Sequence, residues 1–214
     1  MFRTDDASRV PVRLIGCGIF KNEFKLLPEA LQATIKPAFT DSMLHMEPVR
    51  LDGILSAALD DERDDEQDTS TILAFGDCCP YMRELASRKG VARTPGINCC
   101  EIYLGQERYR QLRKERVFFL MPEWAARWKH IFLTELGLHT KELARDFMAQ
   151  SMRRAVYIDT GTVPVPLDPL AEFSEYTGLA VTVEVVGPEH FTAALKTALN
   201  AIRTSGNGLD GNNA

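Results

Sequence analysis

Short apolar runs of four to six residues recur along the chain, separated by longer segments with helical periodicity. Six of these runs are rich in Val, Ile, Leu and Phe and are predicted strands; they cover residues 10–15, 35–39, 71–75, 117–121, 155–158 and 181–186. Between them, apolar residues recur three and four positions apart, as in the stripe of Trp124, Trp128 and Phe132. Such a stripe is typical of a helix face buried in the core. Strands that alternate with helices predict an α/β protein with a Rossmann-like layered fold, in which helices flank a mostly parallel sheet.

The length of 214 residues suits one domain, which we expect to cover residues 10–202. Pro37 lies inside the second apolar run, and because proline cannot donate to a strand ladder, this strand is predicted to lie at a sheet edge. Residues 1–9 are polar and predict a flexible N-terminus. Residues 203–214 are rich in Gly and Asn and predict a disordered tail.

The chain is acidic overall, and part of its negative charge lies in one run. Residues 60–68 hold seven carboxylates in nine positions, which predicts a solvated helix end and loop. Metal chelation by this run is the alternative, although the run lacks the spaced Gly and Asx pattern of a calcium loop. A net charge of -5 argues against a nucleic-acid partner, since phosphate binding needs clustered Lys and Arg.

The chain also lacks membrane signals. No hydrophobic run approaches the ~20 residues that a transmembrane helix needs, and residues 1–6 lack the apolar core of a signal peptide. We therefore expect a cytoplasmic protein. Cytoplasmic thiols are kept reduced, so grouped cysteines are expected to be ligands or reactive groups rather than disulfides.

All five cysteines lie where a predicted strand gives way to a helix. They are Cys17 after the first strand, the pair Cys78 and Cys79 after the third strand, and the pair Cys99 and Cys100. In open parallel sheets, ligands bind beyond the carboxyl ends of the strands, so separate turns can deliver thiols to one site. The sequence predicts a metal or iron–sulfur site made by Cys17, Cys78 and Cys99. Cys79 and Cys100 are alternate ligands or supporting groups.

Thiolate chemistry narrows the choice of metal. Thiolates select zinc, copper(I) or iron–sulfur clusters, and the closely spaced Cys-x-x-Cys pairs of structural zinc are absent. Three thiolates on a [4Fe-4S] cluster would leave one iron open for a substrate. Zinc is the alternative, with His45 as the fourth ligand. Two further interpretations stay open. The cysteines could serve only as small apolar groups in the core, or two of them could form a redox-active thiol pair without a metal.

Polar residues after strands are candidates for catalysis. Asp159 and Thr160 follow the strand at 155–158 and, with His45, are the predicted catalytic groups beside an open metal position. The alternative is a structural role, because Asp and Thr after strands commonly cap the next helix. Neither a dinucleotide-binding glycine fingerprint nor a nucleophile elbow occurs, which lowers the expectation of a common dehydrogenase or hydrolase.

Five short motifs, in order, resemble a known family. They are residues 14–18 with Cys17, residues 44–48 with His45, residues 75–78, residues 98–109, and residues 157–161. Together they resemble the family catalogued as domain of unknown function 1638, over roughly residues 11–200. The resemblance implies one motif cysteine at each of Cys17, Cys78 and Cys99. Cys79, Cys100 and Asn98 depart from the family pattern, as does Ile97, which stands where a histidine is usual.

The resemblance also implies a metabolic role and a partner. Members of this family are associated with anaerobic-type metabolism and often occur beside corrinoid-dependent methyl-transfer proteins. We therefore expect an enzyme or accessory factor in methyl or one-carbon metabolism, with a corrinoid or methyltransferase protein as partner and a small-molecule ligand. A non-catalytic carrier or sensor of metal or clusters is the alternative. Quinolinate synthase and diphthamide synthase, which hold a cluster with three cysteines from separate loops, are similar in arrangement only.

Overall fold

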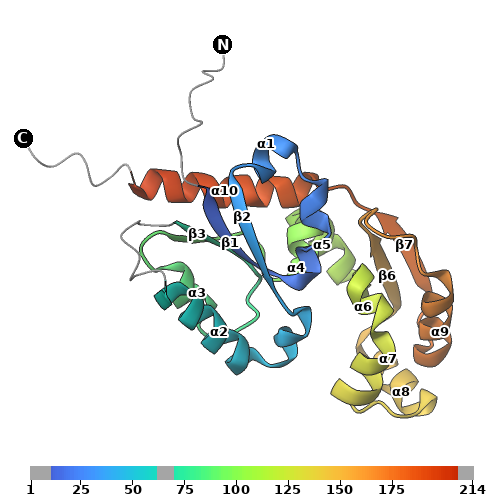
Figure 1. Ribbon diagram of the computed structural model, residues 1–214. Helices are drawn as coiled ribbons and strands as arrows, with labels where there is room; N and C mark the ends of the chain where they lie inside the picture. The colour runs from blue at the N-terminus through green and yellow to red at the C-terminus, as the bar shows by residue number, and fades with distance from the viewer. Residues whose placement is uncertain (1–10, 62–69, 207–214) are drawn as a thin grey trace, which may run out of the picture. The chain divides into compact units, whose positions relative to one another are not determined.

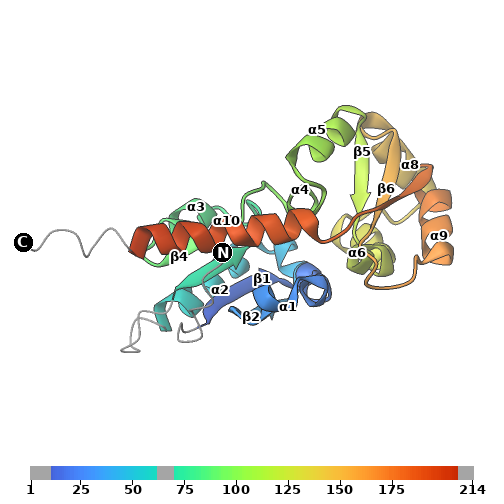
Figure 2. The ribbon, with the colours of Figure 1, turned by 90° about the horizontal axis from the view of Figure 1, so that it is seen from above.

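The computed structural model of the protein describes residues 11–61 and 70–206. In these residues, seven strands form two sheets, and every strand pair is parallel. Helices flank both sheets (Figures 1 and 2), which confirms the predicted Rossmann-like α/β fold. The predicted flexible N-terminus, most of the acidic run and residues 207–214 lie outside the described residues. No helix in the described ranges has the length and apolar character needed to cross a bilayer.

Packing divides the chain into two compact units. Unit 1 comprises Met1–Pro95 and Thr192–Ala214, and unit 2 comprises Gly96–Phe191. Each unit contains one of the two sheets.

The sheet of unit 1 has the strand order β2-β1-β3-β4. Its strands are β1 (Val12–Cys17), β2 (Ile35–Thr40), β3 (Thr71–Ala74) and β4 (Val91–Arg93). β2, which contains Pro37, is an edge strand as predicted. β3 is buried at every position because neighbours pair on both sides and helices cover both faces.

The helices of unit 1 are mostly short. They are η1 (Gly18–Phe20), η2 (Glu23–Leu26), α1 (Glu29–Gln32), η3 (Ser42–Met46), α2 (Pro48–Asp60), α3 (Met82–Ala86) and α10 (Glu189–Gly206), of which unit 1 takes the part from Thr192. α2 and α3 cover one face of the sheet and α10 the other (Figure 1). α2 buries Leu51, Leu55 and Leu59, one residue per turn, against a cluster that we call the unit 1 core.

Two local expectations need correction. Phe20, Phe24 and Leu27 recur at helical spacing, yet residues 20–27 form no single α-helix but the two 3₁₀ turns of η1 and η2. An apolar stripe this short does not distinguish the two kinds of helix. The helix α10 continues to Gly206, so the tail predicted to be disordered from residue 203 begins as helix.

Unit 2 contains the strands β5 (Val117–Leu120), β6 (Arg154–Asp159) and β7 (Val181–Val185), in that order. Its helices are α4 (Cys99–Leu104), α5 (Gln106–Lys114), α6 (Pro122–Ala126), α7 (Trp128–His130), the π-helix η5 (Ile131–Glu135), α8 (Lys141–Ser151) and α9 (Leu167–Thr177). Thr140 caps α8 by accepting from the Leu143 N–H, and Gly178 ends α9 in the left-handed conformation.

An aromatic cluster fills the core of unit 2. Trp128, Phe132 and Phe173 contact one another edge-to-face, and Phe118 of β5 stacks on Phe173. Trp128 and Phe132 of the predicted stripe are therefore core, whereas Trp124 is half-buried and lies outside this cluster.

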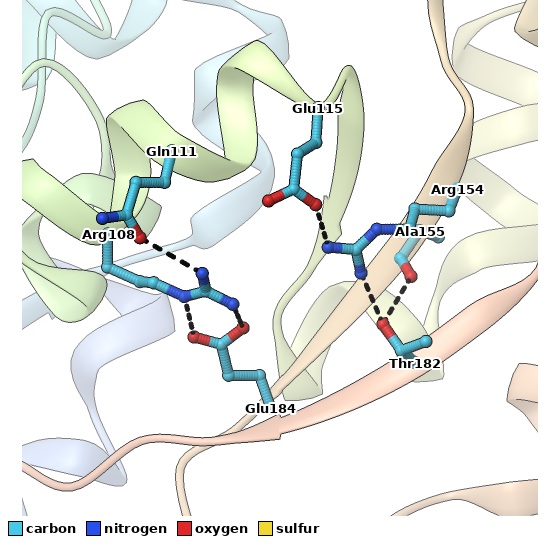
Figure 3. Close-up of polar contacts among 7 residues, drawn as sticks. All are labelled: Arg108, Gln111, Glu115, Arg154, Ala155, Thr182 and Glu184. Atoms are coloured by element: carbon cyan, nitrogen blue, oxygen red, sulfur yellow. Dashed lines mark hydrogen bonds and ion pairs between the residues drawn. The ribbon is translucent and has the colours of Figure 1, made fainter.

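An ion pair joins the edge strand β7 to α5, and a side-chain hydrogen bond joins it to β6 (Figure 3). Arg108 of α5 donates from Nε and Nη2 to the two carboxylate oxygens of Glu184, each at 2.7 Å. Arg154 of β6 donates to Glu115 at 2.6 Å and to the Thr182 hydroxyl at 2.7 Å. These contacts join β7, which has only one strand neighbour, to the elements beside it.

Candidate thiol site

Cys17 and the Cys78–Cys79 pair lie near the carboxyl ends of the two central strands of the unit 1 sheet, β1 and β3. Cys17 is the last residue of β1, which pairs in parallel with β3, so that Gly16 lies opposite Ala74. The two strands therefore end together. Cys17 and Cys78 are half-buried and pack against the unit 1 core, of which Cys79 is a buried member. All three cysteines therefore contact the same apolar core near the carboxyl ends of β1 and β3, and their convergence on one ligand stays a prediction.

The two glycines around Cys17 lie in close packing. A Cβ on Gly18 would lie 2.5 Å from the backbone carbonyl oxygen of Thr40, so this position requires glycine. A Cβ on Gly16 would lie 3.1 Å from the Phe39 ring, a tight contact that a small shift of the ring would relieve. Cys17 is thus held at a backbone position that is tightly packed on both sides.

An ion pair holds the loop that carries Cys78. Asp77, directly before Cys78, accepts from Nη1 of Arg93, the last residue of β4. β4 pairs with β3, with Leu73 opposite Arg93, so the pair connects the loop to the neighbouring strand end. The side chains of Arg93 and Asp77 are 20% and 35% exposed, which places the pair at the rim of the unit.

Cys79 has a different environment from Cys78. Its Sγ donates to Oδ1 of Asp52 on α2 at 3.7 Å. Burial, followed by the negative charge of Asp52, raises the pKa of the Cys79 thiol to about 11. Cys79 is therefore held as a neutral thiol inside the packing, whereas Cys78 lies nearer the surface.

Cys99 and Cys100 begin α4 in unit 2, and both are buried. Asn98 caps the helix, because its Oδ1 accepts from the Glu101 N–H at 2.9 Å. Its Nδ2 donates to the Tyr109 hydroxyl at 2.6 Å. A hydrogen bond with the Cys100 thiol, together with burial, raises the pKa of Cys99 well above its ordinary value.

The predicted catalytic groups take part in local turns. Oδ1 of Asp159 accepts from the Gly161 N–H at 3.0 Å, and the Thr160 and Thr162 hydroxyls lie 3.0 Å apart. These contacts are those of a turn that ends β6. Nδ1 of His45 lies 2.7 Å from the carbonyl oxygen of Ser42. Because a carbonyl can only accept, Nδ1 carries the proton, and in the neutral ring the lone pair lies on Nε2.

The candidate residues are divided between the two units. Unit 1 holds Cys17, Cys78, Cys79 and His45, whereas unit 2 holds Cys99, Cys100, Asp159 and Thr160. Within residues 11–61 and 70–206, the structure shows no group of three or more Cys, His, Asp or Glu side chains arranged to hold a metal ion. The three-cysteine site and its metal stay predictions, as do the catalytic roles.

Two residues that position the thiols were not found from the sequence. Asp52 and Arg93 lie 27 and 16 residues from their partners Cys79 and Asp77. Their contacts depend on how α2 and β4 pack beside β3. The charge of Asp77 directly before a cysteine was the one available signal, and it did not identify Arg93 as the partner.

Comparison with known proteins gives one match. The family described as "Protein of unknown function (DUF1638)" matches residues 39–195, more than half of the chain. Neither the curated proteins nor the solved structures contain a match. The matched region includes parts of both units and contains every candidate site residue except Cys17. The chain belongs to the DUF1638 family, as the motif resemblance implied.

Proposed function

We propose that this protein is a cytoplasmic metalloprotein that binds an iron–sulfur cluster through cysteine thiolates, with Cys17 and Cys78 as ligands. One observation carries the proposal: β1 and β3 are neighbouring parallel strands whose ends place both thiols on the same core cluster. Cys99 is proposed as the third ligand on sequence grounds alone, because it completes the set of motif cysteines.

The donor chemistry of this edge fits a soft metal. Cys17 and Cys78 are half-buried, so an ion could reach them while much of its surroundings stayed dry. Thiolate is the ligand type that iron–sulfur clusters and zinc require. The described side chains are not arranged as a three-ligand group, so the proposal requires the thiolates to move together when the metal binds. When bound, a cluster with an open iron would supply Lewis-acid chemistry.

We place the function in methyl or one-carbon metabolism, as an enzyme or accessory factor that acts beside a corrinoid protein. This part of the proposal is supported by membership of the DUF1638 family and by the motif resemblance. Titration of the metal-loaded protein with methylcobalamin tests it directly, because the visible spectrum reports on the cobalt–carbon bond. We expect a spectral change that requires the metal. No change at any ratio would contradict the corrinoid link.

Protein purified without oxygen tests the metal proposal. We expect iron and acid-labile sulfide in comparable amounts and a broad visible absorption that disappears on oxidation. Zinc without sulfide would favour the zinc alternative, with Nε2 of His45 as a candidate ligand. Protein that neither contains nor takes up metal, but shows a reversible disulfide, would overturn the proposal in favour of redox thiols.

A further inference from the structure

A cavity lies in unit 1 between α1 and α10, at the opposite end of the strands from the thiols. Its volume is about 360 Å³, within the range of small-molecule sites. Thr34, one of the lining residues, comes directly before β2, and its carbonyl accepts from the N–H of Val12 at the start of β1. The cavity therefore lies at the amino ends of the strands, whereas Cys17 lies at a carboxyl end.

The inner part of this cavity is apolar. Among its lining residues, Leu31 of α1 and Leu199 of α10 are buried, with 8% and 4% of their surface exposed. Pro28 and Ala30 add further apolar surface from the turn that contains α1. A hydrocarbon group placed here would be shielded from water on the side of both helices.

The outer part is positively charged. Lys196, Asn200 and Arg203 line it from α10, at positions i, i+4 and i+7, which lie on one face of a helix. None of the described residues that line the cavity is acidic. Within residues 11–61 and 70–206, Lys196 and Arg203 form neither an ion pair nor a side-chain hydrogen bond. In a chain with a net charge of -5, two such cations beside an apolar hollow favour an anionic ligand.

We propose that this cavity binds a small amphipathic carboxylate. The apolar body contacts Leu31 and Leu199, and the carboxylate accepts hydrogen bonds from Lys196, Asn200 and Arg203. The site is independent of the thiol site, so its ligand need not be the substrate of the metal chemistry.

Calorimetric titration with octanoate and with octanamide tests the proposal. The two probes share a hydrocarbon chain and differ in charge. We expect octanoate to bind with one-to-one stoichiometry and octanamide to bind several-fold more weakly. Methyl NMR signals of Leu31 and Leu199 should shift with octanoate. Equal binding of the two probes, or no binding of octanoate, would overturn the proposal.

Matched substitutions locate the charge effect. Because a solvent-exposed ion pair contributes up to about 1 kcal/mol, Lys196→Met and Arg203→Met should each weaken octanoate binding by up to about fivefold. Arg153→Met is the control, since Arg153 lines a cavity of similar size, about 350 Å³, in unit 2. It should leave octanoate affinity unchanged. An equal loss of octanoate affinity in Arg153→Met would show nonspecific charge attraction and would contradict the proposal. Binding of the protein to anionic lipid vesicles without binding to octanoate would assign Lys196 and Arg203 to a membrane surface, and this result would also contradict the proposal.

Discussion

The Cys79 thiol donates a hydrogen bond to the Asp52 carboxylate, with 3.7 Å between Sγ and Oδ1, and so joins the loop after β3 to α2. This contact distinguishes the two adjacent cysteines. Cys79 is directed into the packing between the loop and the helix, and Cys78 stays half-buried at the sheet edge beside Cys17. Neighbouring side chains diverge, so one cysteine of the pair supports the fold while the other is available to a ligand.

Removal of the Asp52 charge should lower the pKa of Cys79. In metal-free Asp52→Asn protein, the pKa should fall below the wild-type value of about 11, but burial should keep it above the ordinary 9.0. The pH dependence of Cys79 alkylation, located by mass spectrometry, measures this shift. Asp60→Asn, on the same helix, should leave the pKa unchanged.

The raised Cys79 pKa also predicts a loss of stability in alkali. Its contribution is fully present below pH 9, the ordinary thiol value, and is lost as the pH rises toward about 11. A two-unit shift corresponds to an upper limit on the order of 3 kcal/mol. Denaturant unfolding of metal-free wild type and Cys79→Ala at pH 8, 9, 10 and 11 measures it. Parallel declines in the two proteins would contradict the assignment.

Loss of the Asp77–Arg93 pair should loosen the loop that carries Cys78. Arg93→Met removes the cation that holds Asp77 at the end of β4, so Cys78 should react faster with iodoacetamide. The free energy of unfolding should fall by only about 1 kcal/mol, because the pair lies at the rim. Arg88→Met, which removes a surface pair with Asp60, is the control. Identical Cys78 alkylation rates in the two variants would argue against a positioning role.

The Arg108–Glu184 pair should stabilise unit 2 in a pH-dependent way. Hydrogen bonding to Arg108 lowers the pKa of Glu184 below its ordinary 4.5, so the stabilisation is present above this pH and is lost in more acidic solution. Glu184→Gln should lower the free energy of unfolding at pH 7 by about 1 kcal/mol, given its two-point contact and partial exposure. Glu172→Gln, which breaks a pair exposed on both sides, should have almost no effect. Equal changes in the free energy of unfolding of the two variants would show that the bidentate geometry adds nothing to stability.

Gly105, between α4 and α5, should be destabilised by any added side chain. Its φ is +77°, and a Cβ would lie 2.7 Å from Nδ1 of His190. Gly105→Ala should lower the free energy of unfolding by more than the ~1 kcal/mol expected for left-handed strain alone. Gly90→Ala is a matched control, because Gly90 has φ +75° with open space around it. Thermal unfolding of both variants measures the difference, and equal losses would refute the clash with His190.

The architecture was largely predictable because its signals are local. Buried parallel strands need continuous apolar runs, which marked β1, β3 and β6. The two 3₁₀ turns between β1 and α1 were not predictable, since a short apolar stripe cannot distinguish them from an α-helix.

The thiol site was predictable only in part. Residue type and position after a strand indicated the cysteines. In the structure Cys17 and Cys78 pack against the same core cluster, and a shared ligand site stays a prediction. Which cysteine of a pair turns inward depends on a distant partner, Asp52, which no sequence pattern marks.

The metal content of three cysteine variants tests the central claim most directly. Iron, sulfide and zinc are measured per protein chain, after purification without oxygen, in wild type, Cys17→Ser, Cys78→Ser and Cys79→Ser. The proposal predicts that wild type and Cys79→Ser retain metal, whereas Cys17→Ser and Cys78→Ser each lose it. Full metal content in Cys17→Ser or Cys78→Ser, or metal-free wild type, would contradict a thiolate site at this edge of the sheet.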